Sequence, residues 1–178
     1  KKEKITILDY GGGMGDSYLE CLYSLGKCHL DIEYHILDLD LTVKQGKKIF
    51  PKEMDIHFHT SFMDCPDNLD MIYVGSTLQY INNYQSLLNE LICCSPKYIF
   101  FTDHFMGNAK TFATTQVNMK NRRMAYWIFN LVEIVSFLEN KGYKNVYRSN
   151  NYQPFHNFDN FIRNKRVDDS CNLLFKKE

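Results

Sequence analysis

A short apolar run that ends in a cluster of glycines is the feature of this sequence that most constrains its fold. Residues 4–9 read Lys-Ile-Thr-Ile-Leu-Asp, a β-branched run typical of a buried strand. The glycines that follow are Gly11, Gly12, Gly13 and Gly15, and residues with helical spacing come after them. Glycine allows positive φ angles and a close approach of the backbone to a ligand. The order strand, glycine loop, helix therefore predicts an α/β fold with a ligand site at the end of the first strand.

The rest of the chain continues to alternate strands and helices. Further strands are expected near residues 32–37, 56–59, 70–74, 98–102, 145–148 and 172–176. Helices are expected near residues 18–23, 42–50, 84–92 and 131–138, the third behind Asn83 and the fourth opened by Asn130 with Glu133. This order predicts a seven-stranded, mostly parallel sheet with an antiparallel last strand and helices on both faces.

Length and composition favour a single domain. The 178 residues lie within the usual domain size, and 44% hydrophobic with 24% charged residues is ordinary for a globular protein. Within a domain spanning 1–178, we expect residues 105–129 to form an insertion that roofs the ligand cleft, and 149–170 to form a loop before the last strand. Because the chain begins with Lys1 rather than methionine, we expect that it has been trimmed at the N-terminus.

The charge balance bears on the class of partner. Lysine and arginine total 21, as do aspartate and glutamate, whereas a nucleic-acid-binding protein of this size is normally more basic. No apolar run approaches the roughly 18 to 20 residues that span a bilayer, and the start lacks the apolar core of a signal peptide. We therefore expect a soluble cytoplasmic protein with a small-molecule partner, no nucleic acid and no membrane span, while its oligomeric state stays open.

The cysteine and histidine spacing does not indicate a metal site. The six cysteines contain no Cys-x-x-Cys pair, so reduced, buried thiols are expected. The closest metal-ligand candidate is His57 with His59 near Cys65, and i,i+2 spacing is also what one strand face gives. We expect no metal. Three other histidines are expected to be structural: His29, His35 and His156.

The spacing of the glycines discriminates between the ligands that such a loop can hold. The dinucleotide fingerprint G-x-G-x-x-G fails in both registers, because its sixth position falls on Asp16 or Tyr18. A carboxylate at the helix start would also repel a pyrophosphate. No Gly-Lys-Ser/Thr follows, which excludes a Walker loop. A nucleotide-dependent oxidoreductase is therefore disfavoured, and a plain flexible turn is the simpler alternative to a ligand loop.

The pattern that does fit is D-x-G-x-G-x-G, with Asp9 at the strand end and Gly11, Gly13 and Gly15 in the loop. It resembles the first motif of class I S-adenosylmethionine-dependent methyltransferases. This resemblance implies S-adenosyl-L-methionine as the cofactor, whose ammonium group suits an acidic loop. It also implies that Asp38, which ends the second strand, accepts hydrogen bonds from both ribose hydroxyls through its two oxygens.

Further matches extend the resemblance along nearly the whole chain. The segments 9–15, 76–80 and 96–99 with Asp103, and Gln116 ahead of 126–129, look like a family of methyltransferases encoded in bacterial surface-polysaccharide gene clusters. The implied fold is the Rossmann-like sandwich of class I methyltransferases. The implied cofactor contacts are Asp9, Tyr10, Gly11, Gly12, Gly13, Gly15, Asp38, Leu39, Ser61, Phe62, Gly75, Ser76 and Thr77. Asp40 is the rival of Asp38, and core packing is the alternative role of Phe62.

Two residues beyond the fifth strand are candidates for the chemistry. His104 is placed where a neutral imidazole can take the proton of a hydroxyl, and Asp103 can orient the histidine or the methyl acceptor. A hydrogen bond within a loop is the alternative role of His104. The fourth strand ends in Gly75-Ser76. It resembles neither the Asp/Asn-Pro-Pro-Tyr/Phe of enzymes that methylate nucleobase amines nor the metal-binding Asp of catechol-type enzymes.

The expected insertion combines cations with aromatic residues. It contains Lys110, Lys120, Arg122, Arg123, Tyr126 and Trp127. Such a mixture suits a sugar, a phosphate or a carboxylated acceptor, and a solvated basic turn is the alternative. The family resemblance implies O-methylation of a sugar or sugar-derived metabolite in surface-polysaccharide synthesis. A methyltransferase fold kept for cofactor binding or assembly without catalysis is the second hypothesis.

Overall fold

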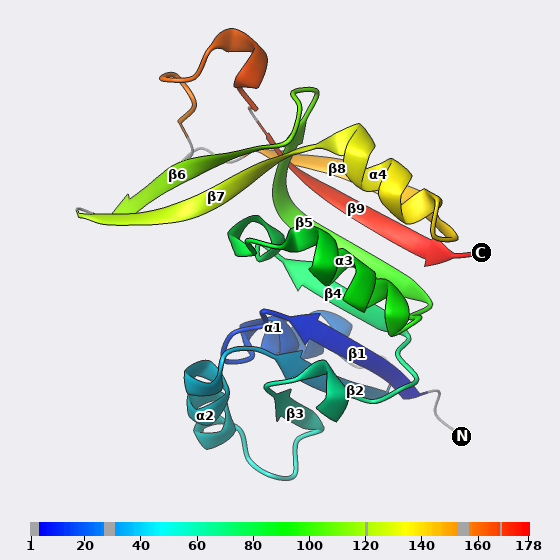
Figure 1. Cartoon of the computed structure of the whole chain (residues 1–178). Helices are drawn as coiled ribbons and strands as arrows, with labels where there is room; N and C mark the ends of the chain where they lie inside the picture. Colours follow the sequence, from blue (N-terminus) through cyan, green and yellow to red (C-terminus); the bar gives the residue numbers. More distant parts are fainter. Residues whose placement is uncertain (1–3, 27–30, 120, 153–156, 168) are drawn as a thin grey trace.

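One mixed sheet runs through the part of the chain that the computed structural model describes, residues 4–26, 31–119, 121–152, 157–167 and 169–178. Within that part the sheet has nine strands, in the order β3-β2-β1-β4-β5-β7-β6, with β9 pairing with β5 and β8 (Figure 1). The strands are β1 (Lys4–Tyr10), β2 (Asp31–Leu37), β3 (Ile56–His59), β4 (Met71–Gly75), β5 (Tyr98–Gly107), β6 (Phe112–Met119), β7 (Arg122–Asn130), β8 (Tyr143–Tyr152) and β9 (Asp169–Lys177).

The first five strands make up the parallel part of the sheet. β1 pairs in parallel with β2 and β4, β2 with β3, and β4 with β5. β9 runs antiparallel to β5 and β8, which confirms the expected antiparallel last strand. Because parallel strands end at a common edge, the loops that follow β1, β2, β3 and β4 meet there.

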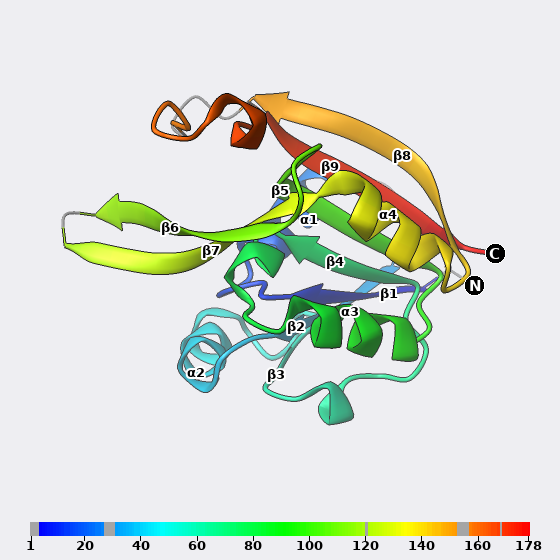
Figure 2. The same ribbon diagram turned by 45° about the horizontal axis from the view of Figure 1, so that its top comes forward.

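Helices cover both faces of the parallel part, as the sequence predicts (Figure 1 and Figure 2). They are α1 (Asp16–Leu25), α2 (Asp40–Ile49), α3 (Tyr84–Cys93) and α4 (Leu131–Glu139). On one face, Ile36 of β2 belongs to a buried cluster with Tyr18 of α1 and Val43 of α2. On the other face, Ile72 of β4 belongs to a buried cluster with Leu88 of α3 and Ile134 of α4.

The helix starts predicted from capping residues are confirmed. Asn83 Oδ1 accepts the N–H of Ser86 at 3.2 Å at the start of α3. Asn130 Oδ1 accepts the N–H of Glu133 at 2.9 Å at the start of α4. These side chains satisfy backbone donors that a helix cannot satisfy by itself. α2 differs, because it begins at Asp40 instead of residue 42.

The largest difference from expectation is the strand content of residues 105–129. Instead of a loop, these residues form the antiparallel hairpin β6–β7, which projects from the body of the molecule (Figure 1). Thr114 lies opposite Tyr126 and Thr115 opposite Ala125. Pairs of β-branched and aromatic residues stabilise such a ladder. This hairpin accounts for the two strands beyond the seven expected.

The fifth strand is longer than predicted and changes its role along its length. β5 continues past Thr102 to Gly107, and its pairing with β9 is irregular between Phe101 and His104. Asp103 lies in this irregular stretch with a φ of 58°, in the left-handed region. Beyond it, Met106 pairs in parallel with Phe129 of β7. The first half of β5 thus belongs to the main sheet and its second half supports the hairpin.

The stretch expected as a loop before the last strand is partly regular structure. β8 reaches Tyr152, and the short 3-10 helix η3 (Arg163–Lys165) precedes β9.

The five cysteines in the described ranges carry free thiols. Cys171 is buried but Cys93 is exposed, so the expectation that the thiols are buried is met only in part. Cys28, His29 and His156 lie outside the described residues. In the described ranges, no helix has both the length and the apolar character needed to cross a bilayer.

Candidate functional site

A cavity of about 840 Å³ opens where the carboxyl ends of β1, β2 and β3 meet. We call it the glycine-loop cavity. Its described lining residues are Tyr10, Gly11, Leu37, Asp38, Leu39, Thr60, Ser61, Phe62, Met63, Thr77, Tyr80, Ile81 and Glu90. The structure therefore brings together seven of the predicted cofactor contacts: Tyr10, Gly11, Asp38, Leu39, Ser61, Phe62 and Thr77.

At Gly11 the glycine loop approaches its neighbours too closely for a side chain. Gly11 has a φ of 74°, and its N–H donates to the carbonyl of Leu37 at 2.8 Å. A Cβ at Gly11 would overlap the Thr77 side chain, which reaches the loop from the end of β4. The loop backbone at Gly11 thus lies close to the ends of β2 and β4, which is why this position requires glycine.

Asp38 is held by the backbone so that its carboxylate faces the cavity. Its Oδ2 accepts the N–H of Gly13 at 2.9 Å, and its Oδ1 accepts the N–H of Leu39 at 2.6 Å. Each oxygen retains a further lone pair for a ligand hydroxyl. The rival Asp40 instead pairs with Lys44 at 2.6 Å on the exposed side of α2. This geometry favours Asp38 over Asp40 as the ligand-facing carboxylate.

Asp9 lies beneath the glycine loop and not in the cavity lining. It is 1% exposed and accepts a hydrogen bond from the Tyr34 hydroxyl at 2.9 Å. A Cβ at Gly12 would overlap the Asp9 carboxyl group. Burial raises the pKa of Asp9 to about 7, against the hydrogen bonds from Tyr34 and Ser17. Asp9 supports the loop from below, which differs from the expected direct contact.

An aromatic pair forms another wall of the cavity. The Tyr10 and Phe62 rings are stacked, with centroids 5.6 Å apart and an interplanar angle of 12°. Phe62 opens the 3-10 helix η1 (Phe62–Asp64), where Ser61 Oγ accepts the N–H of Met63 at 3.2 Å. Phe62 lines the cavity and also packs against the main core, so core packing applies and its contact with a ligand stays a prediction.

Several lining residues are missed by sequence reasoning. Glu90 comes from the middle of α3, and Tyr80 and Ile81 come from the turn that contains the 3-10 helix η2 (Leu78–Tyr80). The local sequence around these residues does not mark them as ligand contacts. Glu90 reaches the cavity through the packing of α3 against the sheet, and Tyr80 and Ile81 reach it through the path of the η2 turn. Six expected contacts are instead outside its described lining: Asp9, Gly12, Gly13, Gly15, Gly75 and Ser76.

A second cavity of about 660 Å³ lies between the hairpin and the body, and we call it the hairpin cavity. Its described lining residues are Ser76, Tyr80, Asp103, Phe105, Thr114, Thr115, Gln116, Val117, Tyr126, Ile128, Asn157, Phe158, Asn160 and Phe161. Tyr80 lines both cavities. Its hydroxyl donates to Gln116 Oε1 at 2.8 Å, and its ring meets the Tyr126 ring edge-on at 5.3 Å. Tyr80 therefore forms part of the wall at which the two cavities adjoin.

Asp103 lines the hairpin cavity in a fixed orientation. Its Oδ1 accepts Asn151 Nδ2 at 3.0 Å and the Ser170 hydroxyl at 3.1 Å. Its own N–H donates to Asn172 Oδ1 at 2.9 Å, which holds the left-handed backbone at this residue. The carboxylate is thus positioned by β8 and β9 toward the space under the hairpin.

His104 is placed differently from expectation. The imidazole is 0% exposed, and its Nε2 accepts the N–H of Leu78 at 3.3 Å. Burial lowers the pKa of His104 to about 4, although Asp103 and the Thr102 backbone oppose this shift. Among the described residues that line either cavity, His104 does not occur. Its side chain supports the η2 turn, because alternate residues of β5 point to opposite faces and the Asp103 irregularity turns His104 inward.

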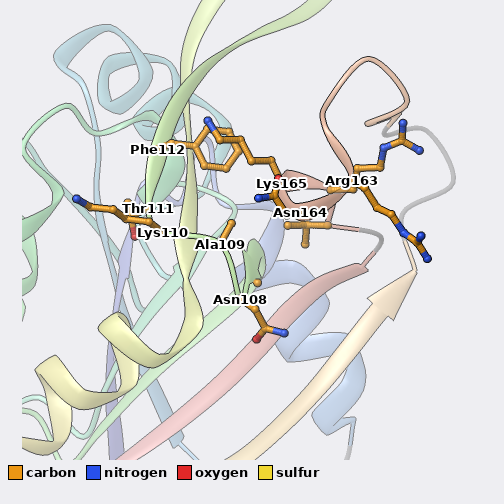
Figure 3. A pocket seen from close by; sticks show the side chains of 11 residues that line it. Asn108, Ala109, Lys110, Thr111, Phe112, Arg163, Asn164 and Lys165 are labelled. Carbon is orange, nitrogen blue, oxygen red and sulfur yellow. The ribbon is translucent and has the colours of Figure 1, made fainter.

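The basic residues of the expected insertion are only partly gathered. Lys110 lines a third cavity of about 800 Å³ together with Arg163, Lys165 and Arg166 (Figure 3). Lys165 Nζ lies 4.7 Å from the centroid of the Phe112 ring. Arg122 and Arg123 are exposed at the far end of the hairpin, and Trp127 packs against Tyr84. Lys120 lies outside the described residues.

Comparisons with known proteins find similarity in structure alone. No protein-family profile and no curated protein sequence matches the chain. An S-adenosylmethionine-dependent methyltransferase from Methanosarcina mazei superposes with a TM-score of 0.69 at 13% identity, covering 99% of this chain and 94% of the other. One from Mesorhizobium loti gives 0.62 at 14% identity, covering 98% and 91%.

A third similar structure has its ligand bound. Magnesium protoporphyrin IX methyltransferase from Synechocystis, solved with S-adenosylmethionine, superposes with a TM-score of 0.67 at 10% identity, covering 98% of this chain and 71% of the other. These likenesses concern the backbone arrangement, since the identities are low. The chain has the Rossmann-like fold of class I S-adenosylmethionine-dependent methyltransferases, with a mostly parallel sheet, an antiparallel last strand and helices on both faces.

Proposed function

We propose that this chain is an S-adenosylmethionine-dependent methyltransferase that methylates a hydroxyl of a sugar or sugar-derived metabolite. The single observation that carries the proposal is the Asp38 carboxylate, which two backbone amides hold toward the glycine-loop cavity. Similarity in fold to methyltransferases, one of them with bound cofactor, supports the same conclusion.

The residues of the glycine-loop cavity fit S-adenosylmethionine better than a dinucleotide. Asp38 and Glu90 both line the cavity, and Asp16 stands in the first turn of α1. Three carboxylates near one loop repel a pyrophosphate but suit a ligand that carries an ammonium and a sulfonium. Asp38 would hold the ribose hydroxyls, Ser61 and Phe62 would flank the adenine, and Thr77 would line the methyl-bearing end.

The hairpin cavity supplies a place for the acceptor. S-adenosylmethionine, when bound, would supply a methyl group on a sulfonium. The acceptor oxygen would attack that methyl carbon in line, and S-adenosylhomocysteine would leave as the thioether. Ser76 lines the hairpin cavity and Thr77 the glycine-loop cavity, so the cavities adjoin at consecutive residues and at Tyr80. Asp103 would hold the acceptor hydroxyl and take its proton, since holding the reacting atoms in line provides much of the acceleration.

The lining of the hairpin cavity supports a sugar-like acceptor. Phe105, Tyr126 and Phe158 present aromatic rings, which pack on the C–H faces of sugars. Gln116 and Asn157 present amides, which donate to and accept from hydroxyls. The link to surface-polysaccharide synthesis rests on the sequence resemblance alone.

A calorimetric titration with S-adenosylhomocysteine tests the cofactor site. We expect micromolar binding, an affinity of about 8 kcal/mol, and no binding of NAD. Asp38→Ala should weaken binding at least about tenfold, because the proposed hydrogen bonds from the ribose hydroxyls are lost. Asp40→Ala is the matched control and should bind like the parent protein. Equal affinities of the two variants for S-adenosylhomocysteine would show that Asp38 does not hold the ligand.

An acceptor screen separates catalysis from binding. The chain is incubated with S-adenosylmethionine and a panel of sugar nucleotides and free sugars, and S-adenosylhomocysteine release is measured. Turnover with a hydroxyl acceptor supports O-methylation. Tight cofactor binding without turnover on any acceptor would instead favour a non-catalytic domain that retains the fold.

A further inference from the structure

Three histidines and a glutamate gather at the β2–β3 edge of the sheet, separate from the glycine-loop cavity. β3 is the last strand on this side (Figure 1). The parallel register places His35 of β2 beside His57 of β3. Because side chains two residues apart share a face, Glu33 and His59 point to the same side as these histidines. Among the described residues that line the glycine-loop cavity, none of the four occurs.

The donor atoms of three of these residues converge. Single ligand atoms of Glu33, His35 and His57 all lie within 4.8 Å of one another. His35 Nε2 lies 3.5 Å from Glu33 Oε1, and His57 Nε2 lies 3.9 Å from the same oxygen. The two separations from Glu33 Oε1 fit ligands around one metal ion, since metal–ligand bonds are about 2.0–2.2 Å long. Any wider spacing, up to the 4.8 Å limit, would have to shorten when an ion binds.

His35 provides the second, independent observation. Its side chain is only 6% exposed, and within the described part of the chain its Nε2 makes no well-formed hydrogen bond, the contact with Glu33 Oε1 being 3.5 Å long. A buried imidazole nitrogen without a partner is unfavourable unless something else satisfies it. This nitrogen is the one that faces Glu33 and His57.

The neighbours of His35 orient it as a ligand. His35 Nδ1 and His59 Nε2 lie 2.9 Å apart, so one shared hydrogen fixes the ring. When His35 Nδ1 carries that hydrogen, Nε2 keeps a free lone pair, which is the arrangement that metal-binding histidines use. Lys4 Nζ lies 3.1 Å from Glu33 Oε2, which leaves Oε1 directed to the histidines.

We propose that Glu33, His35 and His57 bind a divalent transition-metal ion of the zinc type. Two imidazoles and one carboxylate form a ligand set suited to Zn²⁺ and its neighbours, with a remaining position for water. His57 Nε2 now lies 2.9 Å from Asp55 Oδ1 and would exchange this contact for the ion. The ion would fasten the edge strand β3 to β2. This proposal does not depend on methyl transfer.

Cobalt(II) absorption tests the site on the metal-free, untagged chain. We expect one cobalt ion per chain, with visible d–d bands, no thiolate charge-transfer band, and displacement by Zn²⁺. A thiolate band would place the ion on cysteine and overturn the proposal. Absence of any spectral change at millimolar cobalt would overturn it as well.

Substitutions identify the ligands. His57→Asn should weaken cobalt binding by at least about 100-fold, and His59→Gln, which alters only the orienting contact, by about 10–100-fold. Asp31→Asn is the matched control, because this exposed carboxylate lies on β2, the strand of Glu33 and His35, outside the cluster. Both His57 and Asp31 are exposed, so these variants should fold, as circular dichroism can verify. Unchanged cobalt affinity in His57→Asn would refute the assignment.

Discussion

Two buried ionisable side chains near the site have pKa values displaced in opposite directions. Burial raises the pKa of Asp9 from 3.8 to about 7, because the carboxylate loses water beneath the glycine loop. Burial lowers the pKa of His104 from 6.5 to about 4, because the protonated imidazolium loses its contact with water. Both groups therefore favour their neutral forms in the folded protein.

These shifts predict opposite pH dependences of the free energy of unfolding. Asp9 contributes stability below pH 3.8, and this is lost as the pH rises through about 7. His104 contributes stability above pH 6.5, and this is lost as the pH falls through about 4. In the wild-type protein the two slopes oppose each other over much of the acid range.

Urea unfolding of the wild type and of Asp9→Asn between about pH 4 and 7 isolates the contribution of Asp9 to the pH dependence of the free energy of unfolding. The stability of the wild type relative to Asp9→Asn should fall with rising pH, by up to about 4 kcal/mol in total. Relative to His104→Gln it should rise with pH, by up to about 3 kcal/mol. A difference that stays constant with pH for either variant would contradict the burial described for that group.

Asp103→Asn tests the proposed proton acceptor. The amide keeps the size of the side chain and can still accept from Asn151 and Ser170, but it cannot take a proton. We expect turnover to fall by about 100-fold or more, the usual contribution of general base catalysis, with unchanged S-adenosylhomocysteine affinity. An equal loss of cofactor affinity would show that the substitution acts on folding or on the cofactor site.

The candidate site was predictable where it lies at strand ends. Asp38 and the glycine loop follow β2 and β1 directly, so their position is encoded locally. Glu90 was not predictable, since it reaches the cavity only through the packing of α3. His104 was misplaced because a single left-handed residue, Asp103, changes the direction of the side chains that follow.

At the level of elements, α2 contains a glycine that its packing requires. Gly46 is buried in this helix, and a Cβ there would overlap the ring of Phe58 on β3. An alanine in a helix is normally favourable over glycine by about 1 kcal/mol. Here overlap in a packed core costs about 1–3 kcal/mol, which exceeds that gain.

Gly46→Ala should therefore destabilise the protein by about 1 kcal/mol, as urea unfolding can measure. Ser24→Ala, on the exposed side of α1, is the control and should stabilise by up to about 0.5 kcal/mol. Stabilisation by Gly46→Ala would show that α2 and β3 are less tightly packed than described.

The elements differ in how well the sequence predicts them. The helices after Asn83 and Asn130 carry caps that fix their starts, and both were predicted. The hairpin β6–β7 was not, because its far end is exposed and only its base, at Tyr126, Ile128 and Phe129, is buried. The cross-strand cluster at His35 and His57 depends on strand register, which chain spacing does not reveal.

For the whole molecule, the proposed cofactor site links binding to stability. A ligand at 100 times its dissociation constant stabilises the folded state by about 2.7 kcal/mol. For a chain of this size, that corresponds to a rise in Tm of about 5–10 °C. S-adenosylhomocysteine should produce such a rise in thermal unfolding and NAD should not. A rise of the same size with NAD would refute the proposed cofactor selectivity.

The two roles of β5 have a consequence for how this protein can change over generations. One half of the strand is fixed in the main sheet, while the other half carries a hairpin joined to the body at its base. Mutations along β6 and β7 can reshape the space under the hairpin without disturbing Asp38 or the glycine loop. If the proposed function holds, selection on acceptor preference can therefore act on the hairpin alone, while the proposed cofactor site is inherited unchanged.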